Sequence, residues 1–295
     1  MVPEGETLSS LSNPLATVEQ LSNSSSSLDG VPPSLESSIR FAGLQITQAA
    51  GILLRIPQEI IAQAMVIFTR FYLGPEGGSV RKNGAKDVSA ASIYIAAKLS
   101  ADPRTTRSVC NVYAYLMSAP TRQAFPNPPP HDPESYFLSE GSYHSARALL
   151  LQTETIILRT LSFNTKVVVP HHLALTYLQT LGVLPTVPSS TSRNLASRTL
   201  GYLNLALFSP QLLYITHQPT SLAVAAIYLT AREVEVKLPS NEWWEVFDVD
   251  REELGFLVVA LQSCEGWIRA EKERWPGTSC PVTVDGVNLE IKDID

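Results

Sequence analysis

The sequence predicts an all-α protein made of two tandem helical bundles, and three observations lead to that prediction. Apolar residues recur at the three- and four-residue spacing of helices, in segments separated by proline and glycine. No alternation of strand and helix patterns appears, which argues against an α/β fold. A ten-residue pattern also occurs twice, since Ser89 to Lys98 reads SAASIYIAAK and Ala223 to Arg232 reads AVAAIYLTAR.

Length and composition limit the number of domains and the classes of protein that the chain can belong to. A chain of 295 residues with 44% hydrophobic residues can form one large domain or two of ordinary size. The net charge of −6 offers no general attraction for nucleic acid or an anionic membrane. Cys110, Cys264 and Cys280 are far apart and predict neither a disulfide framework nor a zinc site. The longest apolar run, 222–231, is about half of a membrane span and no secretion signal is visible, so we expect a soluble intracellular protein.

Changes in composition divide the chain into four parts. Residues 1–34 are rich in serine, asparagine, glycine and proline, and we expect them to be disordered. The first bundle is expected over 35–167 and includes a polar, proline-rich loop over 118–143. The second bundle is expected over 168–276, and 277–295 remain as a flexible tail or a weak hairpin.

Helix boundaries in the first bundle follow from capping and breaking residues. Pro57 ends one helix and suits the first turn of the next, which the sequence GPEGG terminates. Asp87 is the expected N-cap of the helix that contains the repeated pattern. Pro103 separates this helix from another over 105–117, and a long helix is expected over 143–163.

The second bundle repeats the same order of helical segments. Helices are expected over 171–181, 193–208, 219–234 and 251–270. Asp250 with Glu253 resembles a capping box for the last of them. Only Val282 to Ile291, VTVDGVNLEI, indicates a hairpin, around the turn sequence Asp285-Gly286.

The two copies of the repeated pattern have the composition of central helices. Small residues surround a few large ones in both, and a helix that is apolar on all sides is a buried one. Each copy also ends in a cation, Lys98 or Arg232. A cation there complements the helix dipole while its head group reaches water, so this feature alone does not require a function.

Two segments of the first bundle resemble the signatures of one family. The sequence IYIAAKLSADPR around Lys98 resembles the cyclin box, in which a lysine follows a small-residue helix. The sequence ETIILRTLSF, which begins at Glu154, is similar to the second signature of the cyclins. The segments ITQAAGILLRIPQEI and NEWWEVF further resemble the transcription-associated cyclins of the L type, so that the likeness covers 38–275. The resemblance implies two tandem cyclin-box helical bundles.

The resemblance implies a regulatory subunit and not an enzyme. We expect no cofactor, no metal and no small-molecule substrate. Its partner would be a cyclin-dependent kinase, in a nuclear heterodimer that acts in RNA polymerase II transcription. Lys98 and Glu154 would engage the kinase through main-chain hydrogen bonds, because ammonium donates and carboxylate accepts. Leu99, Leu158 and Phe163 would form the apolar part of the contact, although apolar helix residues are also candidates for the core.

The sequence departs from the family pattern after the lysine and at the C-terminal end. Ser100 and Ala101 stand where cyclins usually carry acidic residues, which leaves open a cyclin-like scaffold that does not activate a kinase. The Arg/Ser-rich region of L-type cyclins is missing, so a role in splicing is in doubt. A DNA-holding factor of the same fold is disfavoured by the acidic balance. An enzyme is disfavoured because the histidines lack metal-site spacing and no G-x-S-x-G or phosphate loop is present.

Overall fold

The computed structural model describes residues 11–118, 136–184, 190–239, 242–275 and 280–294. These residues form helices and loops, with no strand among them, as the all-α prediction requires. The chain divides into two compact units. The first-repeat unit consists of 17–165 and 270–295, and the second-repeat unit of 1–16 and 166–269. The division after residue 165 lies close to the expected end of the first bundle at 167.

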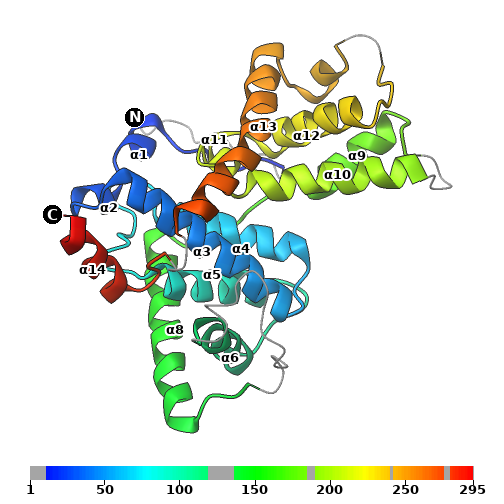
Figure 1. The fold of residues 1–295 in the computed structure, drawn as a ribbon. Coiled ribbons are helices and arrows are strands. Elements are labelled where there is room, and N and C mark those ends of the chain that lie inside the picture. The colour runs from blue at the N-terminus through cyan, green and yellow to red at the C-terminus, as the bar shows by residue number, and fades with distance from the viewer. Residues whose placement is uncertain (1–10, 119–135, 185–189, 240–241, 276–279, 295) are drawn as a thin grey trace, which may run out of the picture. The chain divides into compact units, whose positions relative to one another are not determined.

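Helix α5 is the central element of the first-repeat unit. The other helices of this unit are α1 Val18–Ser22, α2 Ser25–Leu28, α3 Pro33–Leu53, α4 Gln58–Phe71, α6 Thr106–Met117, α8 Glu140–Thr160 and α14 Val284–Ile294. Helix α5, Ala85–Leu99, packs against α3, α4, α6 and α8 (Figure 1). Its alanines and serines are buried on several sides, which permits this close approach of four neighbours.

Glycines allow α3 and α4 to pack closely. A Cβ atom on Gly43 would lie 2.3 Å from Phe68 Cζ, and one on Gly51 would lie 2.5 Å from Ile61 Cγ1. Phe68 and Ile61 are fully buried at these points. The two helices therefore depend on the missing side chains at Gly43 and Gly51.

A buried hydroxyl network fixes the position of α5. The Ser89 Oγ lies 2.7 Å from Thr47 Oγ1 on α3 and 2.6 Å from the Tyr113 hydroxyl on α6. Thr47 Oγ1 also donates to the Gly43 carbonyl at 2.8 Å. Because each of these buried hydroxyls has a partner, the network holds α3, α5 and α6 in register without the cost of an unpaired polar group.

The N-terminus of α5 differs from the sequence prediction. The N-cap is Gly84 and not Asp87, and the helix begins at Ala85. The Lys86 N–H, which has no acceptor within its own helix, donates to the Val282 carbonyl at 3.0 Å. A contact from a distant segment thus caps this helix, and a local capping rule could not have predicted it.

The expected tail or hairpin over 277–295 is wrong for the part that the structure describes. Residues Val284–Ile294 form the helix α14, with Val287 and Ile291 buried at positions one turn apart. The Thr283 hydroxyl accepts the Gly286 N–H at 3.3 Å at its start. Apolar residues four positions apart lie on the same face of a helix, so α14 can bury both of them. An isolated hairpin would be only marginally stable.

The expected disorder of 1–34 is wrong for 11–34, and residues 1–10 lie outside the described part. Ser26 is fully buried, and its hydroxyl accepts the Val80 N–H at 3.1 Å. The Ser24 hydroxyl donates to the Glu36 carboxylate at 2.7 Å. Hydrogen bonds to the bundle therefore order a serine-rich segment that lacks apolar periodicity. Of the expected loop 118–143, residues 119–135 are not described, and α8 already begins at Glu140.

The second-repeat unit is built around α12, Pro219–Glu233. Its other helices are α9 His171–Thr180, α10 Ser190–Ala206, α11 Leu213–Thr216, the 3-10 helix η2 Trp243–Phe247 and α13 Arg251–Arg274, whose last turn belongs to the other unit. Helix α12 packs against α9 and α10 (Figure 1). It also contacts η2. The Glu253 N–H donates to the Asp250 carboxylate at 2.7 Å, which confirms the Asp250 half of the expected capping box of α13.

Candidate functional site

Lys98 and Glu154 meet on the surface of the first-repeat unit. Lys98 Nζ, in the last turn of α5, lies 3.1 Å from Glu154 Oε1 on α8. The Lys98 side chain is 57% exposed, whereas that of Glu154 is 10% exposed. The ammonium also lies 5.5 Å from the ring centre of Tyr94, one turn earlier. The pair therefore combines an accessible donor with an acceptor that α8 holds in a fixed position.

The surroundings favour the charged form of the lysine. Hydrogen bonding to Glu154, followed by the charge of that carboxylate, raises the pKa of Lys98 above the usual lysine value. The position at the C-terminal end of α5 acts in the same direction, because this end of a helix attracts cations. Lys98 is thus held in its charged form and has donor capacity beyond its bond to Glu154.

Exposed apolar residues flank the ion pair in the sequence. Leu99 is 66% exposed and Phe163 is 71% exposed, so neither belongs to the core. Leu158 is half-buried. Phe163 follows α8 with a positive φ of 61°, and its N–H donates to the Leu158 carbonyl at 2.7 Å. This turn beyond the helix end presents the Phe163 ring to solvent.

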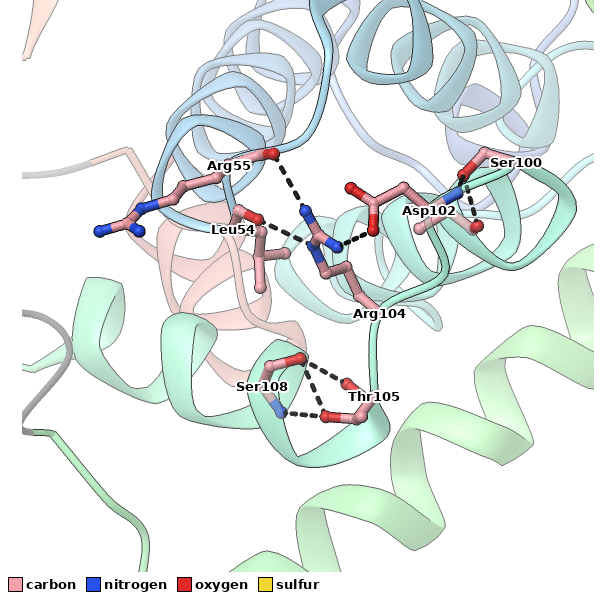
Figure 2. A network of polar contacts seen from close by, with 8 residues as sticks. Leu54, Arg55, Ser100, Asp102, Arg104, Thr105 and Ser108 are labelled. Carbon is pink, nitrogen blue, oxygen red and sulfur yellow. Dashed lines mark hydrogen bonds and ion pairs between the residues drawn. The ribbon is translucent and has the colours of Figure 1, made fainter.

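The segment that follows Lys98 is held by side chains that the sequence interpretation did not single out. The Arg104 guanidinium donates to the carbonyls of Leu54 at 2.9 Å and Arg55 at 3.0 Å, and it pairs with Asp102 (Figure 2). These carbonyls lie at the end of α3, where helix carbonyls lack intrahelical partners. No local sequence signal marks this contact, because the acceptors lie about fifty residues before Arg104.

Ser100 completes the end of α5. Its hydroxyl donates to the Ala97 carbonyl at 2.8 Å and accepts the Asp102 N–H at 3.1 Å (Figure 2). The departure from the acidic family pattern therefore places a capping residue directly after Leu99. Together with Arg104, this cap fixes the backbone that carries Lys98 and Leu99.

Metal and membrane sites receive no support from the described residues. In that part of the chain, no three or more histidine, cysteine or acidic side chains are grouped so that they could hold a metal ion. Within the same ranges, no helix has an apolar stretch sufficient to cross a bilayer.

Comparison with known proteins finds relatives among the L-type cyclins. No family model matches the chain. Cyclin-L1 of Danio rerio is 29% identical over 255 residues, which cover 86% of this chain and 47% of that protein. Cyclin-L2 of Homo sapiens is 30% identical over 255 residues, which cover 86% of this chain and 44% of that protein. The chain therefore resembles the L-type cyclins over most of its own length.

These relatives confirm the predicted likeness to the L-type cyclins. The chain spans about half of their length. Solved structures agree on the cyclin fold. One chain of the yeast RNA Pol II CTD kinase CTDK-1 complex matches with a TM-score of 0.66 and 12% identity, over 97% of this chain and 84% of that one. A viral cyclin from herpesvirus saimiri matches with a TM-score of 0.55 and 13% identity, over 78% of this chain and 85% of that one.

Proposed function

We propose that this protein is a cyclin, the activating subunit of a cyclin-dependent serine/threonine kinase. One observation carries the proposal most directly. The ion pair of Lys98 and Glu154 is accessible at the lysine. The exposed Leu99 directly follows Lys98 in the sequence, and the exposed Phe163 follows the end of α8, the helix that carries Glu154. Polar groups of both kinds beside exposed apolar side chains are what a protein-binding surface requires.

In the proposed complex, Lys98 donates hydrogen bonds to main-chain carbonyls of the kinase, and Glu154 accepts from N–H groups. Leu99, Leu158 and Phe163 cover the apolar side of the docked kinase helix. Docking would fix the kinase helix that carries the glutamate of its lysine–glutamate pair, which completes the ATP site. The cyclin supplies binding free energy and no catalytic group.

The relatives support the transcriptional context of the proposal. The matched cyclins are of the L type, and one solved neighbour is part of an RNA polymerase II CTD kinase complex. We therefore propose that the kinase acts in RNA polymerase II transcription or coupled RNA processing, and that the heterodimer is nuclear. The net charge of −6 gives the chain no general attraction for DNA, which supports a protein partner over a DNA-holding role.

Co-purification from the native cell tests the proposal. The charge-swapped double variant Lys98→Glu/Glu154→Lys keeps an internal ion pair but reverses the charges offered to a partner. We expect the wild type to retain a kinase and this variant to lose it, because the partner's polar groups become desolvated and unpaired at a cost of about 2–5 kcal/mol.

A second charge swap in the same unit provides the control. Arg107 and Glu140 also form an ion pair, at 2.9 Å between α6 and α8, outside the proposed surface. The double variant Arg107→Glu/Glu140→Arg should retain the kinase as the wild type does. Loss of the kinase from both swapped variants, or from neither, would contradict the proposed surface. A bound kinase without activity would instead indicate a scaffold.

A further inference from the structure

The second-repeat unit contains a pocket that the proposed kinase contact does not use. It has a volume of about 700 Å³ and opens between the end of α12, η2 and the start of α13. Arg232 and Arg251 contribute cations to its lining, Glu242 contributes one carboxylate, and Tyr228 and Trp244 contribute aromatic rings. Apolar residues of α13 form the remainder.

Two of the lining residues occupy the positions of Tyr94 and Lys98 in the internal repeat. The Arg232 guanidinium lies 5.8 Å from the Tyr228 ring centre, much as the Lys98 ammonium lies 5.5 Å from that of Tyr94. The two repeats differ in what the cation meets. Lys98 pairs with Glu154, whereas among the described residues no carboxylate lies within ion-pair distance of Arg232. The second repeat thus presents a cation that is available to a ligand.

Two further donors of the pocket, on Arg251 and Trp244, have no partner among the described residues. Arg251 lines the same pocket and has no ion pair with any residue that the structure describes. The Trp244 Nε1–H is buried and finds no acceptor within the described ranges. A buried donor without a partner is costly, and a ligand that offers an acceptor would remove that cost. Two guanidinium groups and an indole N–H can therefore donate hydrogen bonds to a compact anion that has several acceptor atoms.

We propose that this pocket binds a phosphorylated serine or threonine side chain within a peptide. A phosphate group offers three strong acceptor oxygens and nearly two negative charges, which suit a pocket lined by two arginines. The pocket is larger than one phosphate group, and its apolar α13 wall suits a neighbouring peptide side chain. The net charge of −6 disfavours a long polyanion such as RNA, whereas a single phosphate group meets mainly the two local arginines.

If the proposed function holds, the pocket would bind a substrate segment that the bound kinase has already phosphorylated. This consequence rests on the proposed function. Such retention would raise the local concentration of the remaining sites of a multisite substrate. Phosphopeptide binding itself requires no kinase. The binding test therefore uses the full chain purified without kinase, so its failure is distinct from failure of kinase activation.

Fluorescence anisotropy with a labelled peptide pool tests the proposal. The pool carries a central phosphoserine between degenerate residues, and matched pools carry serine or glutamate there. We expect saturable binding of the phosphoserine pool, at least about tenfold tighter than binding of either matched pool. Arg232→Gln or Arg251→Gln should weaken this binding by at least about tenfold, because each removes charge-assisted hydrogen bonds. Glu242→Gln should strengthen it, since it removes the only carboxylate described in the lining.

Arg269 provides the matched control, because it lies on α13 with Arg251, is 72% exposed and is outside the pocket. Arg269→Gln makes the same charge change and should leave binding unchanged. Trp244→Phe keeps an aromatic ring, removes the indole donor and should weaken binding. The proposal would be overturned if the phosphoserine pool did not bind, or if the serine pool bound equally well. It would also be overturned by equal losses of binding from Arg269→Gln and Arg251→Gln, or by displacement of the peptide by a single-stranded RNA oligonucleotide.

Discussion

Asn13 and Val168 are joined by two hydrogen bonds although they are far apart in the sequence. The Asn13 side chain donates to the Val168 carbonyl at 2.7 Å and accepts the Val168 N–H at 2.8 Å. Gln218 completes the arrangement, because its side chain bonds both the N–H and the carbonyl of Asn13. One asparagine therefore satisfies both backbone groups of a residue near the start of the second repeat.

Removing the Asn13 side chain should destabilise the second-repeat unit. Asn13→Ala leaves the Val168 N–H and carbonyl without these partners, and an unsatisfied buried group costs about 1–3 kcal/mol. Urea denaturation should show a loss of this size in the free energy of unfolding. Asn23→Ala, at an exposed asparagine of α1's C-cap, should change it by less than about 0.5 kcal/mol. Equal losses of unfolding free energy from Asn13→Ala and Asn23→Ala would show that the Asn13 hydrogen bonds do not stabilise the backbone at Val168.

Alanine should have opposite effects at two helical glycines. Gly43→Ala places a methyl group 2.3 Å from Phe68 Cζ and should cost about 1–3 kcal/mol, because the packed helices must move apart. Gly201→Ala, in α10, meets no atom within 4 Å and should stabilise by about 0.5–1 kcal/mol through helix propensity. Thermal denaturation distinguishes the two, and a stabilising Gly43→Ala would contradict the close packing of α3 on α4.

The Arg104 contact with the end of α3 should contribute to stability and to kinase retention. Arg104→Ala removes two bonds to helix carbonyls and should cost about 2 kcal/mol. Arg104→Lys keeps the charge but lacks the planar fork, so it should recover only part of the loss. Chemical denaturation measures the first effect, and kinase co-purification should fall with it because the backbone after Lys98 is loosened. Full recovery by lysine would mean that charge alone acts at this position.

Cys280 should report whether the C-terminal segment is docked. Burial, together with the nearby Glu271 and Glu290 carboxylates, raises the pKa of Cys280 to about 12. Thiol alkylation at pH 8 should therefore be slow in the folded protein. Val287→Asp, at a fully buried position of α14, should accelerate alkylation of Cys280. Leu289→Asp, at a position that is 62% exposed on the same helix, should not.

The same pKa shift sets the direction of a pH effect on stability. Below the ordinary thiol pKa of about 9, the thiol is protonated in both the folded and the unfolded state, so its contribution is fully present. Between about 9 and 12 the unfolded thiol ionises first, and stability falls as the pH rises. Cys280→Ser should reduce the alkaline loss of stability, and an unchanged pH profile would contradict burial of the thiol.

The sequence predicted those parts of the fold that local patterns determine. The repeated small-residue helices, the breaks near Pro57 and Pro103 and the Asp250 cap all lie where expected. The prediction was wrong for 11–34 and 284–294, where long-range contacts create the structure. The dipeptide Asp285-Gly286 is typical of a turn and therefore predicted a hairpin. In the structure Val287 is fully buried on a helix, and a single sequence does not reveal the residues that bury it.

The candidate site was predictable only where family motifs marked it. The resemblance pointed to Lys98 and Glu154, and the structure places them in contact. Arg104 and Trp244 were not predicted to contribute to a site. The acceptors of Arg104 lie on another helix, and the unpaired donor of Trp244 is visible only when the pocket is formed.

Kinase activation in a purified system tests the central claim most directly. A candidate kinase identified by co-purification is titrated with the wild type, with Lys98→Glu/Glu154→Lys and with Arg107→Glu/Glu140→Arg, and activity is followed on a peptide of the polymerase II C-terminal repeat. We expect the wild type and the Arg107/Glu140 swap to activate the kinase equally, and the Lys98/Glu154 swap to give no activation at the same concentrations. Full activation by the Lys98/Glu154 swap would contradict the account.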